Sequence, residues 1–237
     1  MNRRLTNLIR FVMDECLPPL LRDNRYFMWP FFYLAYHGRQ IAEVMEFKSR
    51  VLHFSTEQYR DFYAGLDSIS RRRDTDLNRP CLDAIETVVD AEQPESVLDA
   101  GCGNGYLLSL LKRRNGQLKL SGADVVPPPS SFDFPYHQIE LESLDSVVAP
   151  HDLVVCAHTL EHVRDLQKAM VVLRRLARRT LLIVVPCQRY YYFTLDEHLH
   201  FFPDRCSLVS QLGVVEPEIK ACHKLAGDWL LVLGGTA

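Results

Sequence analysis

The chain has 237 residues, of which 47% are hydrophobic and 24% are charged, close to the average of globular proteins. Its formal net charge is −3 and it has no extended basic stretch, so we expect no nucleic-acid partner. Seven cysteines without a C-x-x-C pair favour reduced thiols in a cytoplasmic protein over a disulfide framework.

Residues 1–77 show helical patterns and hold 13 of the 24 aromatic side chains. Residues 1–17 have the basic start of a signal peptide, but charged residues interrupt the apolar run, which favours an amphipathic helix. Ser55 and Gln58 have the spacing of a helix capping box. The apolar stretch 27–36 is too short to span a membrane, which leaves contact with a membrane surface open. We expect this helical extension to be a lid over a site, a contact between subunits, or a cap that buries its own aromatics.

From Asn78 onward, apolar runs of strand length alternate with helical patterns, which is typical of a parallel sheet with helices on both faces. The first element is a helix with Asn78 as its N-cap and Pro80 in its first turn. The last two predicted strands are close enough in sequence to form a hairpin. The predicted strands are 96–100, 118–125, 136–141, 151–157, 180–186, 214–222 and 228–235, and the predicted helices are 78–91, 104–114, 162–179 and 204–212.

The stretch VLDAGCGNGYLL, residues 97–108, places three glycines between an apolar strand and a leucine-rich helix. Glycines at this point let the backbone approach a ligand closely, and the following helix offers unpaired N–H groups. Tight turns also need glycine for conformational reasons alone, so the loop by itself does not identify a ligand. Asp124 ends the next strand, 19 residues beyond Gly105, where a carboxylate can bind both hydroxyls of a ribose. Together the two features indicate an adenosine-like ligand.

The spacing of this loop distinguishes between adenosine-containing ligands. Dinucleotide loops follow G-x-G-x-x-G, which would need a glycine at Tyr106, whereas this loop is D-x-G-x-G-x-G with Asp99 before the first glycine. A carboxylate there would repel a pyrophosphate, but it suits a ligand that carries an ammonium or sulfonium group. A nicotinamide-dependent oxidoreductase is therefore disfavoured.

These segments resemble, in order, the motifs of the class I S-adenosylmethionine-dependent methyltransferases. The resemblance covers residues 78–236 and rests on VLDAGCGNGYLL, GADV, HQIELESL, HDLVVCAHTLEHV, LLIVVPC and DEHLHFF. It implies an α/β fold, a Rossmann-like three-layer sandwich with a seven-stranded, mostly parallel sheet and a C-terminal antiparallel hairpin. Residues 78–237 would form the cofactor-binding methyltransferase domain, and residues 1–77, to which no resemblance extends, a helical extension.

The resemblance also implies the cofactor, S-adenosylmethionine, which becomes S-adenosylhomocysteine on transfer. Asp99 and the glycine loop would surround its methionine part, and Asp124 would hold its ribose. Glu140 and Leu141 would flank its adenine, in a register that the sequence leaves open by a residue or two. The residues implied to contact the cofactor are Asp99, Ala100, Gly101, Cys102, Gly103, Asp124, Val125, Glu140, Leu141, Ala157 and His158.

Methyl transfer from a sulfonium is an in-line displacement, so a site can work by positioning its reactants and excluding water. A base is needed only if the acceptor must lose a proton, which makes histidines near the strand ends the candidates. We expect His158 first, and His200 or His198 second, as the catalytic residue, and His162 to pack or cap locally. No metal site is expected, because the chain lacks the H-E-x-x-H and C-x-x-C spacings.

The predicted function is methyl transfer to a small-molecule or glycan-type acceptor, with oxygen favoured over nitrogen because imidazoles are available as bases. The alternatives are N-methylation of a small molecule, and a non-catalytic binding or scaffold protein that keeps the fold. The intact glycine loop and its two acids argue against a scaffold. The acceptor pocket is expected to draw on the aromatic loop 188–202 and on the extension. We expect a cytoplasmic monomer or homodimer without a transmembrane segment.

Overall fold

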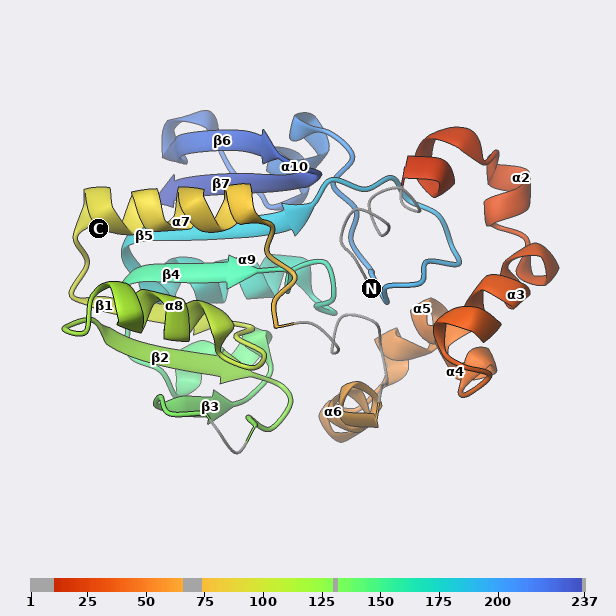
Figure 1. Cartoon of the computed structure of the whole chain (residues 1–237), viewed down its shortest axis with the longest axis horizontal. Coiled ribbons are helices and arrows are strands. Elements are labelled where there is room, and N and C mark those ends of the chain that lie inside the picture. The colour runs from red at the N-terminus through yellow and green to blue at the C-terminus, as the bar shows by residue number, and fades with distance from the viewer. Residues whose placement is uncertain (1–10, 66–73, 130–131, 236–237) are drawn as a thin grey trace.

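The computed structural model of the chain describes residues 11–65, 74–129 and 132–235. At its centre lies a seven-stranded sheet with the strand order β3-β2-β1-β4-β5-β7-β6 (Figure 1). The first five strands run parallel, and β7 is antiparallel to both of its neighbours. The strands are β1 (Ser96–Ala100), β2 (Lys119–Asp124), β3 (Tyr136–Gln138), β4 (His151–Ala157), β5 (Ala177–Pro186), β6 (Ile219–Leu225) and β7 (Asp228–Gly234).

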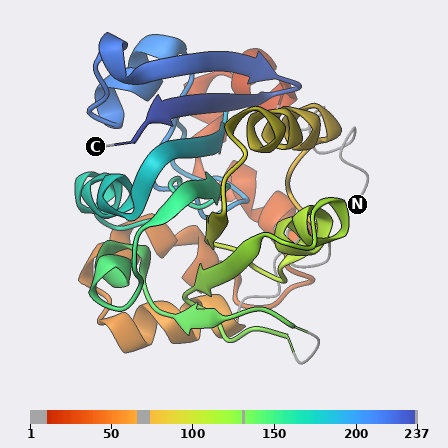
Figure 2. The ribbon, with the colours of Figure 1, turned by 90° about the vertical axis from the view of Figure 1, so that its left-hand side faces the viewer.

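Helices cover both faces of this sheet, which gives three layers (Figure 2). One face carries α7 (Arg79–Glu92) and α8 (Tyr106–Arg114). The other carries α9 (Leu166–Leu176), α10 (Arg205–Gln211) and the 3-10 helix η4 (Leu141–Ser146). Each face has its own core of buried apolar side chains, because successive residues of a strand point to opposite faces. The predicted Rossmann-like sandwich with its C-terminal antiparallel hairpin is confirmed.

The start of α7 shows how local sequence fixes an element and ties it to the sheet. The side-chain oxygen of Asn78 accepts a hydrogen bond from the backbone N–H of Cys81 at 2.7 Å, as predicted for an N-cap. The amide nitrogen of the same side chain donates to Asp228 Oδ2 at 2.8 Å. The cap therefore also anchors the helix to the first residue of β7.

Two element boundaries differ from the sequence prediction. The helix predicted over 162–179 is confined to Leu166–Leu176, and residues 177–179 instead begin β5, where Ala177 pairs with His151 of β4. The strand predicted over 214–222 begins only at Ile219, because Glu216–Glu218 form the 3-10 turn η5 around Pro217. In both places the backbone hydrogen bonds are decided by the neighbouring chain segment or by proline, not by apolar patterning.

The described part of residues 1–77 is helical and lies beyond the carboxyl ends of the parallel strands (Figure 1). The capping box is confirmed, since Ser55 and Gln58 exchange side-chain-to-backbone hydrogen bonds. The amphipathic helix predicted over 1–17 falls mostly outside the described residues. Among the described residues, no helix combines the length and apolarity needed to cross a bilayer. The elements are the π-helical turn η1 (Val12–Cys16), α2 (Pro19–Arg22), α3 (Arg25–Ala35), α4 (Ile41–Met45), α5 (Phe47–Arg50), the 3-10 turn η2 (Val51–His53) and α6 (Thr56–Gly65).

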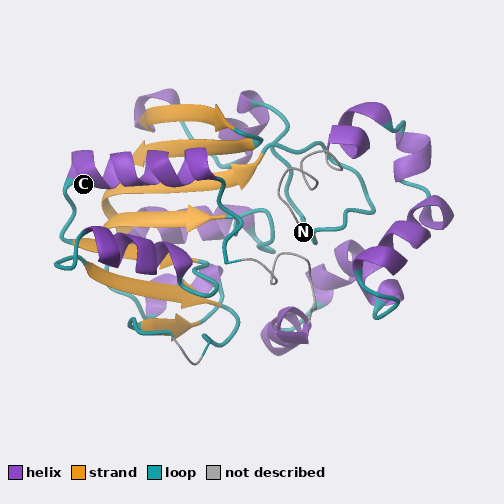
Figure 3. Cartoon of the chain, viewed as in Figure 1, coloured by secondary structure: helices purple, strands orange, loops and turns teal. Residues whose placement is uncertain are grey.

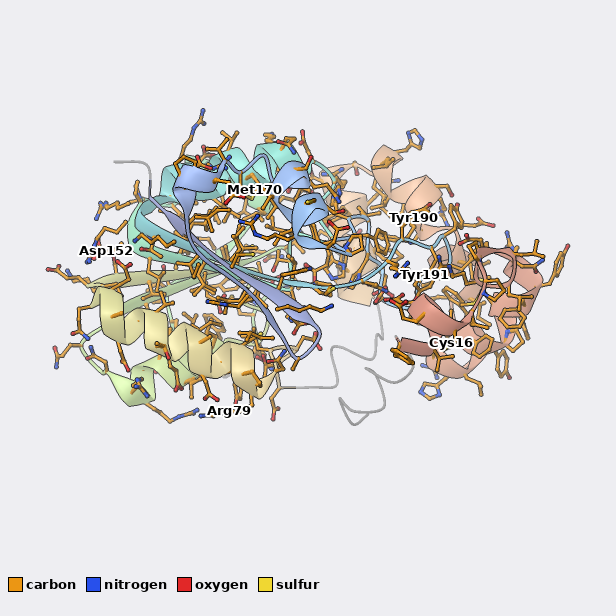
Figure 4. All side chains as sticks on the ribbon, turned by 90° about the horizontal axis from the view of Figure 1, so that it is seen from above. Cys16, Arg79, Asp152, Met170, Tyr190 and Tyr191 are labelled. Carbon is orange, nitrogen blue, oxygen red and sulfur yellow. The ribbon has the colours of Figure 1, made fainter. Side chains whose placement is uncertain are left out.

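The long loop after β5 joins the N-terminal helices to the sheet. Tyr190 and Tyr191 of this loop lie between the two parts (Figure 4). Tyr191 and Phe193 are buried in one cluster with side chains of α3 and α4. Lys48 Nζ donates to the carbonyl of Tyr191 at 2.7 Å and lies 4.5 Å from the ring centre of Phe201. The N-terminal helices therefore share a core with the loop after β5.

Candidate active site

A cavity of about 540 Å³ opens at the carboxyl ends of β1, β2 and β4, where the strand order reverses. The loop after β4 and the long loop after β5 extend from the sheet toward the N-terminal helices (Figure 3). Tyr59, Tyr63 and Ala64 of α6 form the side of the cavity that faces the strand ends. Its volume falls within the usual range of small-molecule and cofactor sites.

The glycine loop forms the floor of this cavity. Gly101 has a φ of +86°, and a Cβ there would lie 1.9 Å from Thr159 Oγ1, so no other residue fits without moving the loop after β4. The backbone N–H groups of Gly101 and Cys102 both donate to the carbonyl of Ala123, at 2.7 and 3.0 Å. The turn is therefore fixed by β2 on one side and by Thr159 on the other.

The carboxylate of Asp124 is held rigidly at the end of β2. Its Oδ2 accepts from the backbone N–H of Gly103 at 2.9 Å, and its Oδ1 accepts from Val126 N at 3.2 Å. A carboxylate oxygen can accept more than one hydrogen bond, so both oxygens keep capacity for a ligand in the cavity. The arrangement suits a ribose diol, as the sequence predicts.

Asp99 supplies a second carboxylate to the cavity, and it is only 3% exposed. Burial, with a further contribution from the negative charge of Asp124, raises the pKa of Asp99 to about 7. Two acids that face one cavity create a site that a cationic ligand would stabilise. S-adenosylmethionine carries such charges on its ammonium and sulfonium groups, so the residues present fit the predicted cofactor.

The predicted adenine residues lie at the border between the cavity and α6. Both carboxylate oxygens of Glu140 lie 2.8 Å from Arg164 Nη2. The guanidinium of Arg164 lies 4.9 Å from the ring centre of Tyr59 and also donates to the carbonyl of Phe54. Leu141 lines the same side of the cavity. Glu140 and Arg164 thus connect the cofactor side of the cavity to the N-terminal helices.

Ten of the eleven residues predicted to contact the cofactor line the cavity. The exception is Ala100, which is wholly buried within β1, so its side chain cannot reach a ligand there. The ten are Asp99, Gly101, Cys102, Gly103, Asp124, Val125, Glu140, Leu141, Ala157 and His158.

His158 lines the cavity, but its ring lies between two buried carboxylates. Its Nδ1 is 3.3 Å from Glu161 Oε1, and its Nε2 is 3.4 Å from Asp228 Oδ2. Burial alone would lower the pKa of His158, but Asp228 and Glu161 outweigh burial and raise it to about 10. A ring that holds both protons near neutral pH has no lone pair with which to accept another. These two carboxylates favour a structural ion-pair role for His158 over the predicted role as base.

His198 and His200 do not line the cavity. Nε2 of His200 lies 2.9 Å from the carbonyl of Val163, and the ring packs beneath the loop after β4. His198 is buried, with its Nδ1 2.6 Å from Gln188 Oε1. Because neither ring faces the cavity, neither of them is placed to act as the predicted second base.

The histidine that does face the cavity beside α6 is His162, which was predicted to pack locally. The hydroxyl of Tyr59 donates to its carbonyl at 3.1 Å, and the hydroxyl of Tyr63 lies 3.4 Å from its Nδ1. His162 follows His158 by four residues in the non-helical turn after β4, and both residues line the cavity. The extension was expected to contribute to the acceptor pocket, but no motif marks the residues that do so, which lie in α6 and in 74–77.

Comparisons with known proteins agree with this geometry. A family model described as a methyltransferase domain matches residues 71–212. The solved CurJ carbon methyltransferase has a TM-score of 0.56 and 11% identity, over 100% of this chain and 72% of that chain. An O-methyltransferase family protein from Burkholderia thailandensis has a TM-score of 0.52 and 16% identity, over 90% and 70%. The methyltransferase domain of bacterial CtHen1-C has a TM-score of 0.52 and 19% identity, over 67% and 98%. No curated protein sequence matches the chain.

Proposed function

This chain belongs to the methyltransferase domain family and is an S-adenosylmethionine-dependent methyltransferase, for which we propose an oxygen of a small molecule as the methyl acceptor. The main support for the proposal is that one cavity is lined on two sides by residues of different chemistry. One wall holds the glycine loop with Asp99 and Asp124, and the other holds His162 with two tyrosines of α6. The first suits a cationic adenosine derivative and the second a polar organic molecule.

The cofactor is proposed to lie across the ends of β1 and β2. Asp99 would accept a hydrogen bond from its ammonium group, and Asp124 would accept from its ribose hydroxyls, supported by the burial of Asp99 and by the place of Asp124 at the end of β2. When bound, the cofactor supplies an electrophilic methyl group from its sulfonium. The close backbone turn at Gly101 leaves room for the ligand where a side chain would otherwise stand.

The acceptor is proposed to lie between the cofactor and α6. Tyr59 and Tyr63 present hydroxyl groups, and burial raises the pKa of both, so they act there as neutral hydrogen-bonding groups. Their rings also exclude water from the space in which the acceptor and the methyl group must align. Oxygen is proposed over nitrogen because Tyr59, Tyr63 and His162 offer polar atoms that can orient a hydroxyl.

In this proposal the two parts of the chain bind different ligands. Residues 78–237 would bind the cofactor, while residues 1–77 would cover the acceptor as a helical cap. The cavity must hold both ligands within about 540 Å³, which favours a small molecule or a short glycan-type acceptor over a polymer.

Calorimetry with S-adenosylmethionine and S-adenosylhomocysteine tests the cofactor assignment. We expect Asp124→Ala to weaken both ligands by roughly 10- to 100-fold, because a charge-assisted hydrogen bond to the ribose is lost. The matched control is Asp83→Ala on the exposed side of α7, which should bind like the unmodified chain. Undiminished affinity in Asp124→Ala would contradict the assignment.

The acceptor class is tested by transfer of a labelled methyl group to paired hydroxyl and amine forms of the same small molecules. We expect label on oxygen and, in Tyr63→Phe, a higher KM for the acceptor with little change in cofactor affinity. Label on amines alone would favour the N-methyltransferase alternative. Tight cofactor binding without transfer to any acceptor would favour a binding protein.

A further inference from the structure

We propose that Glu161, His162 and His198 form a binding site for a divalent transition-metal ion just behind the wall of the cavity, which His162 lines. Each offers one ligand atom, and these three atoms all lie within 4.8 Å of one another. Two imidazoles and a carboxylate form a donor set that binds Zn²⁺ and related ions while leaving coordination positions open. The ion-binding site stands independently of the proposed methyl transfer, whereas its role toward the acceptor rests on that function.

The fold brings these residues together from two separate loops. Glu161 and His162 follow β4, and His198 lies in the long loop after β5. The backbone N–H groups of Leu199 and His200 donate to the carbonyl of Glu161 at 2.7 and 3.1 Å, which fixes the two loops against each other. Ligands that come from two separate loops show no short sequence motif such as H-E-x-x-H. For this reason no metal site was expected from the sequence.

Glu161 is the strongest reason to place a cation here. Its side chain is 0% exposed, and among the described residues no side-chain or backbone group forms a well-directed hydrogen bond to either carboxylate oxygen. Buried carboxylates are ordinarily paired with charge or bound to a metal. The ring of His158 lies 3.3 Å from Glu161 Oε1, but its other nitrogen faces the buried Asp228. One ring shared between two buried carboxylates leaves Glu161 without a partner of its own among the described residues.

The two histidines are oriented as metal ligands usually are. Nδ1 of His198 lies 2.6 Å from Gln188 Oε1, and Nδ1 of His162 lies 3.2 Å from the carbonyl of Glu197. Amide and carbonyl oxygens only accept, so each Nδ1 carries the proton and each Nε2 keeps a lone pair for an ion. Nε2 of His198 lies 4.0 Å from Glu161 Oε1.

The groups behind these histidines are themselves fixed. Gln188 donates from its amide nitrogen to Asp196 Oδ2 at 3.2 Å, which directs its oxygen toward His198. Glu197 has a φ of +52°, a left-handed backbone conformation that non-glycine residues seldom adopt, and its carbonyl is the one that meets His162. Hydrogen-bonded supports of this kind raise the affinity of a histidine site for its ion.

Small side-chain movements would complete the coordination. Ligand atoms about 2.0–2.2 Å from an ion lie roughly 3–3.5 Å apart, so the three side chains need to close by about 1 Å. His162 lines the cavity, and the open positions of the ion would therefore face the acceptor. There the ion would bind the acceptor oxygen and lower the pKa of its hydroxyl, so that the proton could pass to solvent before the alkoxide accepts the methyl group, and no histidine need act as the base.

The test is direct titration of the chelator-treated full chain with Zn²⁺, followed by calorimetry, and with Co²⁺, followed by visible absorption. We expect one equivalent to bind, and His198→Ala and His162→Ala each to weaken binding at least tenfold. The matched control is His223→Ala, which removes an exposed histidine from β6 and should bind like the unmodified chain. Circular dichroism of each variant verifies folding, and His162→Ala, at the less buried ligand, serves if His198→Ala does not fold.

Three outcomes would overturn the proposal. They are no binding at millimolar metal, unchanged affinity in His162→Ala, or an equal loss in His223→Ala, which would indicate adventitious binding at the surface. Since the titration contains neither cofactor nor acceptor, a chain that binds the ion but fails to bind S-adenosylmethionine would contradict only the proposed function.

Discussion

The positions of Asp99 and Asp124 at the cavity could be predicted, because neighbouring residues in the sequence determine where each side chain lies. A glycine turn after a buried strand specifies where Asp99 must lie, and the end of the next strand specifies Asp124. The histidines were not predictable in this way. His158 faces Asp228, 70 positions further along the chain, and that contact makes it a charged partner of the carboxylates instead of a base. A residue's protonation depends on neighbours that only the tertiary fold supplies.

The affinity for S-adenosylmethionine is expected to depend on pH through Asp99. Burial raises the pKa of Asp99 to about 7 in the free protein, and the ligand's ammonium group would favour the ionised form. Binding is then coupled to proton release, so the affinity should rise by up to about tenfold per pH unit below 7 and level off above it. Calorimetry between about pH 5.5 and 7.5 measures this slope.

The control for this dependence is Asp99→Asn, which keeps the shape of the side chain and removes its titration. It should bind more weakly at pH 7 and show a flat profile. A flat profile in the unmodified chain would mean that Asp99 does not meet the charged end of the cofactor.

At the scale of elements, strands and helices were predictable wherever one face of each is buried, since apolar periodicity records burial. The end of α9 was not, because Ala177 and the two arginines after it favour helix intrinsically, whereas Ala177 pairs with His151 of β4 and the strand continues from there. The contacts between α6 and the loops at the edge of the sheet could not be predicted from the sequence either. They depend on Arg164, whose guanidinium joins Glu140, the carbonyl of Phe54 and the ring of Tyr59.

Arg164→Ala is therefore expected to destabilise the protein by about 1–3 kcal/mol, because Glu140, which is 9% exposed, loses its countercharge. The estimate stays below that of a fully buried pair, since Arg164 retains 22% exposure. The free energy of urea unfolding measures the effect, and acceptor KM should rise as α6 loosens. The matched control is Arg175→Ala, whose pair with Asp145 is well exposed and should matter by less than about 0.5 kcal/mol. Equal effects of the two substitutions would contradict the proposed connection.

At the scale of the whole molecule, the N-terminal helices pack on the methyltransferase fold through the loop after β5, in a cluster distinct from the two cores of the sheet. Tyr191 and Phe193 lie in the same buried cluster as Met28 and Phe32 of α3. The hydroxyl of Tyr36 also bonds to the carboxylate of Glu197, beside the proposed metal site. The aromatic richness of residues 1–77 left a lid, a subunit contact and a self-contained cap as alternatives. It gave no partner, since the partner is a loop distant in the sequence.

Because the N-terminal helices share a core with the loop after β5, they are expected to unfold together with the methyltransferase fold. The chain's two tryptophans report on them separately, with Trp29 in α3 and Trp229 in β7, where its indole N–H donates to the carbonyl of Phe202 at 2.9 Å. In Trp229→Phe and Trp29→Phe, which each retain one tryptophan, thermal fluorescence transitions should coincide with loss of circular dichroism. S-adenosylhomocysteine at 100 times its Kd adds about 2.7 kcal/mol of stability, which corresponds to a rise in Tm of roughly 5–10 °C. Since α6 forms one wall of the cavity, both reporters should move by the same amount. An earlier Trp29 transition that S-adenosylhomocysteine leaves unmoved would show instead that the N-terminal helices fold independently of the cofactor site.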